Sequence, residues 1–322
     1  MFAMIKFHHC FPFAVRAWTL LFVWVCATAG PVRAGEDCRS PWGADDQRGA
    51  ANRLTPAKTL EATALIKEGK VYQLGRPYES AMPNYGTRSY TLVIPQMRGP
   101  LGKNQLTWNE EYVAAQIGQV GTQFDGLGHV GINGRFFNCN DARDFVRAEG
   151  LKRLGVENVG SFFTRGVLID VAGYKGVANL EKGYEITVDD LKGSLAKEGV
   201  SLREADAVVI HTGWGRHWMT HNDLYTSGAP GIGMAAGRWL VEQKVVLVGA
   251  DTAGVEVAPN PSDPTMEAEV HQMLLTRNGI YLLENLVTLE LARDRVYEFA
   301  FIFSPLKLKG ATGSPGNPLA VK

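Results

Sequence analysis

The sequence is poor in cysteine, balanced in charge and free of long apolar runs, and each shortage argues against a class of protein. Its 322 residues include only 4 cysteines and no CxxC pair, so cysteine-based redox or zinc chemistry is not expected. Lys and Arg together number 33, as do Asp and Glu, so no net field favours nucleic acid or an anionic membrane. No apolar run reaches the ~18 residues of a membrane-spanning helix. A small or neutral partner is therefore expected.

The first 34 residues have the layout of an export signal. Lys6 and Arg16 precede an apolar run from Ala17 to Ala29, and Val32-Arg33-Ala34 offers a small-residue cleavage site. That run is too short to cross about 30 Å of hydrocarbon as a helix. An uncleaved membrane anchor and cleavage after Ala29 are the alternatives. We expect a secreted or periplasmic protein, free of the membrane after cleavage, with residues 35–322 as one domain.

Cleavage would also decide which cysteines the mature protein keeps. It would remove Cys10 and Cys26 and leave Cys38 and Cys139 in an oxidising compartment. Two cysteines in such a compartment favour a disulfide between them. Two free thiols are the alternative.

Short apolar runs and amphipathic segments follow one another irregularly along residues 35–322. A helix is predicted after Thr55-Pro56, which offers an N-cap followed by proline, and others over about 188–197, 233–243 and 265–277. Seven runs have strand length, and several are apolar throughout, as expected for strands covered on both faces: Tyr90–Pro95, Tyr112–Ile117, Val167–Val171, Ala207–His211, Val245–Val248, Ile280–Leu283 and Tyr297–Phe303. Without strict alternation, we expect an α/β domain with a mixed sheet and some α+β character.

A glycine-rich stretch from Gly118 to Gly131 carries the densest group of polar residues. Its glycines indicate a sharply turning backbone that leaves space for another group. Asp125 and His129 lie within it, and a carboxylate and an imidazole on a rigid loop can ligate a metal or act as orienter and base. The alternative is a tight turn in which Asp125 caps local N–H groups and His129 lies on the surface.

Two further candidates lie near the C-terminal end of the sequence. His271 is on a predicted amphipathic helix, and Glu284 follows the next apolar run. Sites in α/β sheets are built at the ends of buried strands. Taken alone, His271 also suits a satisfied core position, and Glu284 also suits an ion pair with an arginine.

Together the two clusters resemble the cyclase family that includes kynurenine formamidase and isatin hydrolase. The family pattern H-x-G-T-H-x-D-x-P-x-H is matched at Gly121-Thr122, Asp125 and His129. Its later histidine and glutamate are similar to His271 and Glu284. Other stretches resemble the same family: VIHTGW at 209–214, GIG at 231–233 and VGADTAGVEV at 248–257.

The resemblance implies a fold, an assembly and a chemistry. The fold is the swivelling β/β/α type, assembled as homodimers or homotetramers, and the activity is metal-dependent hydrolysis of a small amide, lactam or ester. Asp125, His271 and Glu284 would bind a divalent ion that activates water. His129 would be the general acid/base that moves a proton to the leaving group.

The sequence departs from the family pattern at two ligand positions, where Gln119 and Gln123 replace histidines. An amide oxygen is a harder donor than imidazole and a poorer partner for Zn²⁺. Three outcomes follow: Mn²⁺ held with the help of one or both glutamine carbonyls, weakly bound Zn²⁺, or no metal. Oxygen-rich donor sets favour Mn²⁺ or Mg²⁺ over Zn²⁺, so we expect Mn²⁺ before Zn²⁺.

Other side chains and another function complete the expectations. Four side chains are candidates for the substrate pocket, with core packing as the alternative for each aromatic one: Trp108, Phe124, His211 and Trp214.

The rival function is an exported small-molecule binding protein with the same fold and a degenerate metal site. Gln119 and Gln123 favour that rival, whereas the retained acidic and imidazole groups favour an enzyme. No nucleic-acid partner is expected.

Overall fold

The computed structural model describes residues 39–95 and 98–322, which lie within one compact unit, Gly35–Lys322. The predicted export signal and Cys38 lie outside the described residues. None of the described helices combines the length and the apolar character needed to cross a membrane.

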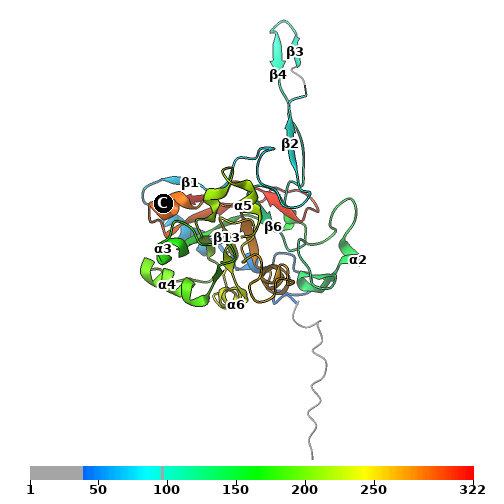
Figure 1. The fold of residues 1–322 in the computed structure, drawn as a ribbon. Coiled ribbons are helices and arrows are strands. Elements are labelled where there is room, and N and C mark those ends of the chain that lie inside the picture. Colours follow the sequence, from blue (N-terminus) through cyan, green and yellow to red (C-terminus); the bar gives the residue numbers. More distant parts are fainter. Residues whose placement is uncertain (1–38, 96–97) are drawn as a thin grey trace, which may run out of the picture. The chain divides into compact units, whose positions relative to one another are not determined.

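One mixed sheet organises the described chain (Figure 1). Its nine strands are, in spatial order, β1 (Val71–Gln73), β17 (Leu319–Val321), β15 (Glu298–Phe303), β9 (Phe162–Asp170), β11 (Ala207–His211), β13 (Leu247–Ala250), β14 (Tyr281–Glu284), β6 (Gln123–Asp125) and β16 (Gly313–Pro315). The adjacent strands β9, β11, β13 and β14 are parallel, and the strands on either side of them pair antiparallel. The parallel strands therefore all end at one edge of the sheet.

Helices surround this sheet. The α-helices are α1 (Pro56–Thr63), α2 (Ala142–Phe145), α3 (Val171–Lys175), α4 (Val188–Glu198), α5 (Asn222–Thr226), α6 (Met234–Glu242), α7 (Glu269–His271) and α8 (Leu289–Arg293). Tighter 3₁₀ turns are η1 (Gly49–Arg53), η2 (Phe137–Cys139), η3 (Val156–Asn158) and η4 (Trp214–His217), and η5 (Gln272–Arg277) is a π-helix. Local chemistry sets the bounds of α4, where Thr187 and Asp190 form a capping box and left-handed Gly199 ends the helix.

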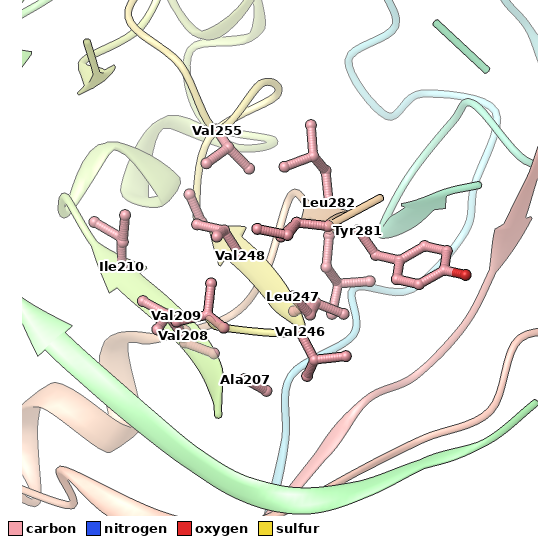
Figure 2. Close-up of a cluster of buried hydrophobic side chains, with 14 of the residues drawn as sticks. Ala207, Val208, Val209, Ile210, Val246, Leu247, Val248, Val255, Tyr281 and Leu282 are labelled. Carbon is pink, nitrogen blue, oxygen red and sulfur yellow. The ribbon is translucent and has the colours of Figure 1, made fainter. Parts of the chain in front are cut away.

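The core lies along the parallel strands. Every residue of β11 and β13 is buried, and Figure 2 shows Val208, Val209 and Val248 gathered with Tyr281 and Leu282 of β14. Because both faces of these strands are covered, their sequences are apolar throughout rather than alternating.

Four short ladders complete the described structure: β2 (Tyr90–Val93) with β5 (Tyr112–Ala115), β3 (Arg98–Leu101) with β4 (Leu106–Trp108), β7 (Arg135–Phe136) with β8 (Asn140–Asp141), and β10 (Glu185–Ile186) with β12 (Gly231–Ile232). The first two form an arm, residues 90–95 and 98–115, that extends away from the large sheet (Figure 1). Apolar side chains are exposed along it: Leu92, Val93, Ile94, Leu101, Leu106, Tyr112 and Val113.

The prediction of a mixed α/β fold is confirmed, and the differences are local. The predicted strand Ala207–His211 has the observed bounds of β11. The glycine-rich stretch is not a continuous turn, because Gln123–Asp125 forms the buried strand β6. The helix predicted from residue 265 begins at Glu269 and passes into a π-helix.

Candidate metal centre

The pairing of β6 with β14 places the two carboxylates of the candidate site on one face of the sheet. The strands are antiparallel, and Gln123 lies directly opposite Glu284. Since alternate residues of a strand point to the same face, Gln123 and Asp125 share a face and Phe124 points to the other. Phe124 is fully buried there and stacks on Tyr281, with ring centroids 5.0 Å apart. The register of this ladder therefore positions Asp125 and Glu284 together.

His271, the last residue of α7, is held in one orientation by Glu256. The Glu256 carboxylate accepts a hydrogen bond from the His271 main-chain N–H at 3.1 Å and contacts ring atom Nδ1. Because the carboxylate takes Nδ1–H, Nε2 is left to face the site. Nε2 lies 3.0 Å from Glu284 Oε1 and 3.7 Å from Asp125 Oδ2. Glu256 thus fixes the orientation of the ring and, when the imidazole is neutral, favours the tautomer with its proton on Nδ1.

Asp125, His271 and Glu284 form a set of metal-donor groups. One donor atom from each lies within 4.8 Å of the others. Asp125 and Glu284 are 0% and 2% exposed. Among the described residues, Asp125 Oδ2 has no hydrogen-bond partner, although a buried charged oxygen needs one. A cation at this point would supply that partner, so the donor set fits a divalent metal ion.

Negative charge predominates around the imidazole. Burial, followed by the neighbouring Asp125 carboxylate, raises the pKa of Glu284 to about 7. Burial opposes a charge on His271, but hydrogen bonds with Glu256 and Glu284 prevail and raise its pKa well above the usual value. Three carboxylates therefore surround one imidazole, and a proton or a metal ion must balance their charge.

Both glutamines lie against these carboxylates. Gln123 Nε2 donates to Glu284 Oε2 at 2.6 Å, and Gln119 Nε2 donates to Asp125 Oδ1 at 3.3 Å. The structure thus brings Gln119 and Gln123 to the centre as hydrogen-bond donors, whereas the sequence indicated oxygen ligands. Rotation of each amide by about 180° would exchange its nitrogen and oxygen.

His129 lies at the edge of the centre. Its main-chain N–H donates to Gly126 O at 3.0 Å, which closes a tight turn. Its Nε2 lies 3.9 Å from Asp125 Oδ1, and its side chain is 21% exposed, against 1% for Asp125. An imidazole between a buried carboxylate and solvent can exchange protons between the two.

The four candidate pocket residues lie on four different elements of the fold. Phe124 on β6 and Trp214 on η4 are 0% and 2% exposed and pack among other buried residues, and their place in a substrate pocket stays a prediction. Trp108 lies on β4 of the arm. His211 lines a different cavity, which contains none of the metal-donor residues.

Glu256 is the site residue that sequence reasoning missed. Its neighbours Val255 and Val257 are 1% and 6% exposed. An acidic residue inside such an apolar run indicates a buried charge that requires a partner. This signal was present in the sequence, but it did not say which partner.

Comparisons with known proteins agree with this architecture. A family model described as "Putative cyclase" matches residues 72–257. The chain is similar to a solved structure described as a novel cyclase, with 33% identity and a TM-score of 0.78, covering 87% of this chain and 98% of that one. A comparison with curated proteins gives no match.

Two more distant structures share the fold. Isatin hydrolase A from Ralstonia solanacearum is 20% identical with a TM-score of 0.58, covering 84% of this chain and 98% of that one. A structure described as a potential metal-dependent hydrolase with cyclase activity is 19% identical with a TM-score of 0.50, covering 78% of this chain and 98% of that one.

Proposed function

The chain belongs to the cyclase family, and on that premise we propose that it is a hydrolase that uses a divalent metal ion to cleave an amide, lactam or ester bond in a small molecule. One observation carries the proposal. Asp125 Oδ2, buried and without a partner among the described residues, lies beside His271 Nε2 and Glu284. The names of the structurally similar isatin hydrolase and metal-dependent hydrolase support it.

Each residue of the centre has a distinct part in this reaction. Asp125, His271 and Glu284 would hold a divalent ion, which would supply a Lewis acid for the substrate carbonyl and would lower the pKa of bound water. Glu256 keeps Nδ1 of His271 occupied, so that Nε2 faces the other donors. His129 Nε2 accepts the proton of the attacking water and donates it to the leaving nitrogen or oxygen. Hydrolysis therefore ends with a carboxylate and an amine or alcohol.

The experiment that tests this proposal combines metal content with turnover. Mature protein purified without chelator is analysed for metal and assayed on N-formyl amides, lactams and esters. We expect near-stoichiometric metal, and turnover that a chelator abolishes and Mn²⁺ restores. Protein that binds neither Mn²⁺ nor Zn²⁺ after dialysis against each would contradict the proposal.

The glutamines bear on which ion is held. We propose Mn²⁺ before Zn²⁺, because Gln119 and Gln123 offer oxygen where imidazole would favour Zn²⁺. Replacing both by histidine should raise the association constant for Zn²⁺ more than about tenfold, and more at pH 7 than at pH 5, because each imidazole must lose its proton to ligate. Titration calorimetry measures both effects. Equal Zn²⁺ affinity in the two proteins would show that these positions do not face the ion.

A small-molecule binding protein without a working metal centre is the second candidate. The observation in its favour is that Gln119 and Gln123 donate a hydrogen bond to one oxygen of each carboxylate, Asp125 Oδ1 and Glu284 Oε2. Tight binding of an intact amide or ester, with no turnover in the presence of Mn²⁺, would favour it over the hydrolase.

Assembly and location belong to the same proposal. We propose a homodimer or homotetramer in which the arm contacts a second copy, because an exposed row of apolar side chains is typical of an interaction surface. Light scattering gives the mass in solution, and a monomer would contradict this.

We also propose export, with a Cys38–Cys139 disulfide in the mature protein. Thiol titration of the unreduced, denatured protein tests the pairing, and two free thiols would contradict it.

A further inference from the structure

A second cavity lies at the same edge of the sheet as the metal centre. Its volume is about 370 Å³. His211 ends β11 and Asp251 directly follows β13, so the cavity opens at the carboxyl ends of two parallel strands. Its cationic side chains are Arg76 and Arg216, and Leu286, Val287 and Leu289 line it with apolar atoms. We refer to it as the Arg76 cavity.

Arg76 is held by main-chain carbonyls and, among the described residues, forms no direct ion pair. Its Nε donates to Asn285 O at 3.0 Å, and its Nη2 donates to Gly215 O and Leu286 O, each at 3.1 Å. Its guanidinium also lies over the Trp218 ring, 4.8 Å from the centroid. The N–H groups of Nη1 have no acceptor among the described residues, and no described carboxylate lies within ion-pair distance of Arg76. Burial lowers the pKa of this arginine, and the nearby Tyr225 and Asp251 oppose that shift only in part, so a further anionic partner would stabilise its charge.

Asp251, the acidic residue of the cavity, is already occupied. Its Oδ1 accepts from the Thr212 main-chain N–H at 2.9 Å and from the Thr212 hydroxyl at 2.6 Å. Its Oδ2 accepts weakly from Gly215 N at 3.4 Å and lies 3.4 Å from His211 Nδ1. Asp251 therefore holds the loop after β11, and its single negative charge offsets only one of the two arginine charges.

His211 adds a polar atom to the cavity. Its Nδ1 lies 2.6 Å from Thr288 Oγ1 and faces Asp251, which fixes the ring. The residue is 5% exposed. Its Nε2 has no hydrogen-bond partner within the described part of the chain, and it is the polar atom that His211 has left for a ligand.

We propose that the Arg76 cavity binds a small organic monocarboxylate. Two arginines against one saturated aspartate leave a net positive charge that suits one anionic group, and the planar guanidinium fork matches a carboxylate. The leucine and valine wall suits an apolar body of the ligand, which a strongly hydrated inorganic anion lacks. The volume is within the range of small-molecule sites.

This inference stands without the proposed function, since it uses none of the metal-donor residues. The proposed ligand and the proposed reaction are related in one way. Hydrolysis of an amide, lactam or ester releases a carboxylate, so the ligand class includes a product of the reaction. A carboxylate from another source would bind in the same way. The experiment must therefore separate binding here from binding at the metal centre.

The test measures binding of the probe benzoate to the full mature chain. Titration calorimetry gives the affinity, and thermal unfolding gives the stabilisation by the bound probe. We expect saturable binding of benzoate, and much weaker binding of its neutral analogue benzamide and of inorganic phosphate. Arg216→Gln, at an exposed residue without side-chain hydrogen bonds in the described structure, should weaken benzoate roughly two- to fivefold. Arg76→Lys, which keeps charge but loses the fork, should weaken it about tenfold or more. Arg238→Gln on α6 is the exposed control and should change nothing.

Three results would overturn the proposal. Benzamide that binds as tightly as benzoate would leave only an apolar cavity. Benzoate affinity unchanged by both Arg216→Gln and Arg76→Lys would place its carboxylate elsewhere. Loss of benzoate binding in Glu284→Gln, with retention in Arg216→Gln, would assign the probe to the metal centre. Failure of the hydrolase proposal is seen separately, in metal content and turnover.

Discussion

The metal centre and the Arg76 cavity are opposite in charge, although they are built at the same edge of one sheet. Glu284 ends β14, whereas His211 ends β11 and Asp251 follows β13. At the first site three carboxylates face one imidazole, and at the second two guanidiniums face one saturated carboxylate. The end of a buried strand places a side chain at the edge of the sheet, but it does not determine the charge of the site built there. The residues placed there, and the partners they lack, decide whether the site attracts a cation or an anion.

Asn285 joins the two regions. Its carbonyl accepts from Arg76 Nε and from the Thr122 hydroxyl, each at 3.0 Å. Its side chain accepts from Tyr225 and donates to Gly121 O. It follows Glu284 directly, so the two sites are rigidly connected while their ligand groups stay separate. Their functions should accordingly be separable by mutation.

The largest expected effect comes from removing a carboxylate of the metal centre. Asp125→Ala takes away the unpaired buried oxygen, so we expect the metal to be lost and turnover to fall about 10³-fold or more. Benzoate binding at the Arg76 cavity should persist. Metal analysis, an activity assay and calorimetry on the same preparation measure the three quantities. Full metal content in this variant would show that Asp125 is not a metal ligand.

His129 should affect the reaction without affecting the metal. Replacing it by Ala is expected to lower turnover roughly 10²–10⁴-fold, because it removes the proton-transfer group. Metal content should stay near the wild-type value, and His221→Ala, an exposed histidine elsewhere, serves as the control. If metal and activity disappear together, His129 is a ligand and not the acid/base.

A smaller effect is expected when Glu256 is changed to Gln. The amide can no longer hold Nδ1–H of His271 as strongly, and loss of such a supporting carboxylate lowers metal affinity about 10–100-fold. Competition with a metal-sensitive dye measures it. The control is Glu269→Gln on α7, the helix that carries His271. The Glu269 carboxylate accepts from Asn260 and not from His271, so its replacement should leave metal affinity unchanged. Equal losses in both variants would point to a general effect on α7.

The smallest effect concerns Glu198, a partly buried carboxylate that forms no ion pair among the described residues. It accepts from Asp170 N at 2.8 Å, its Oε2 has no partner among the described residues, and burial raises its pKa to about 8. Because this pKa lies above the ordinary 4.5, its stabilising contribution is full below about pH 4.5 and is lost as pH rises toward 8.

Glu198→Gln should remove that loss. The Tm of the variant is expected to fall less than that of the wild type between pH 5 and 8, by about 2 °C after allowance for solvent screening. The exposed Glu242→Gln is the control. Parallel Tm curves for wild type and Glu198→Gln would show that burial alone does not set the behaviour of carboxylates in this protein.

The sequence predicted many of the strands and helices and both carboxylates of the metal centre, Asp125 and Glu284, but it did not predict how they are arranged in space. Apolar runs such as Ala207–His211 were recognisable because strands buried on both faces are apolar throughout. Strand β6 was not, because its three residues lie among glycines and become a strand only by pairing with β14 and β16. The partner of Glu256 was likewise hidden, since His271 is 15 positions away along the chain. Periodicity reports which residues are buried, and only the tertiary pairing reports what they meet.

The ladder between β6 and β14 also bears on how such a centre can change over generations. Gln123 lies opposite Glu284 because of strand register, which is set by main-chain hydrogen bonds between β6 and β14. Histidine and glutamine codons differ only in their third base. A lineage can therefore exchange imidazole for amide at positions 119 and 123 by one nucleotide substitution at each, while the strand pairing that aligns Asp125 and Glu284 is inherited unchanged.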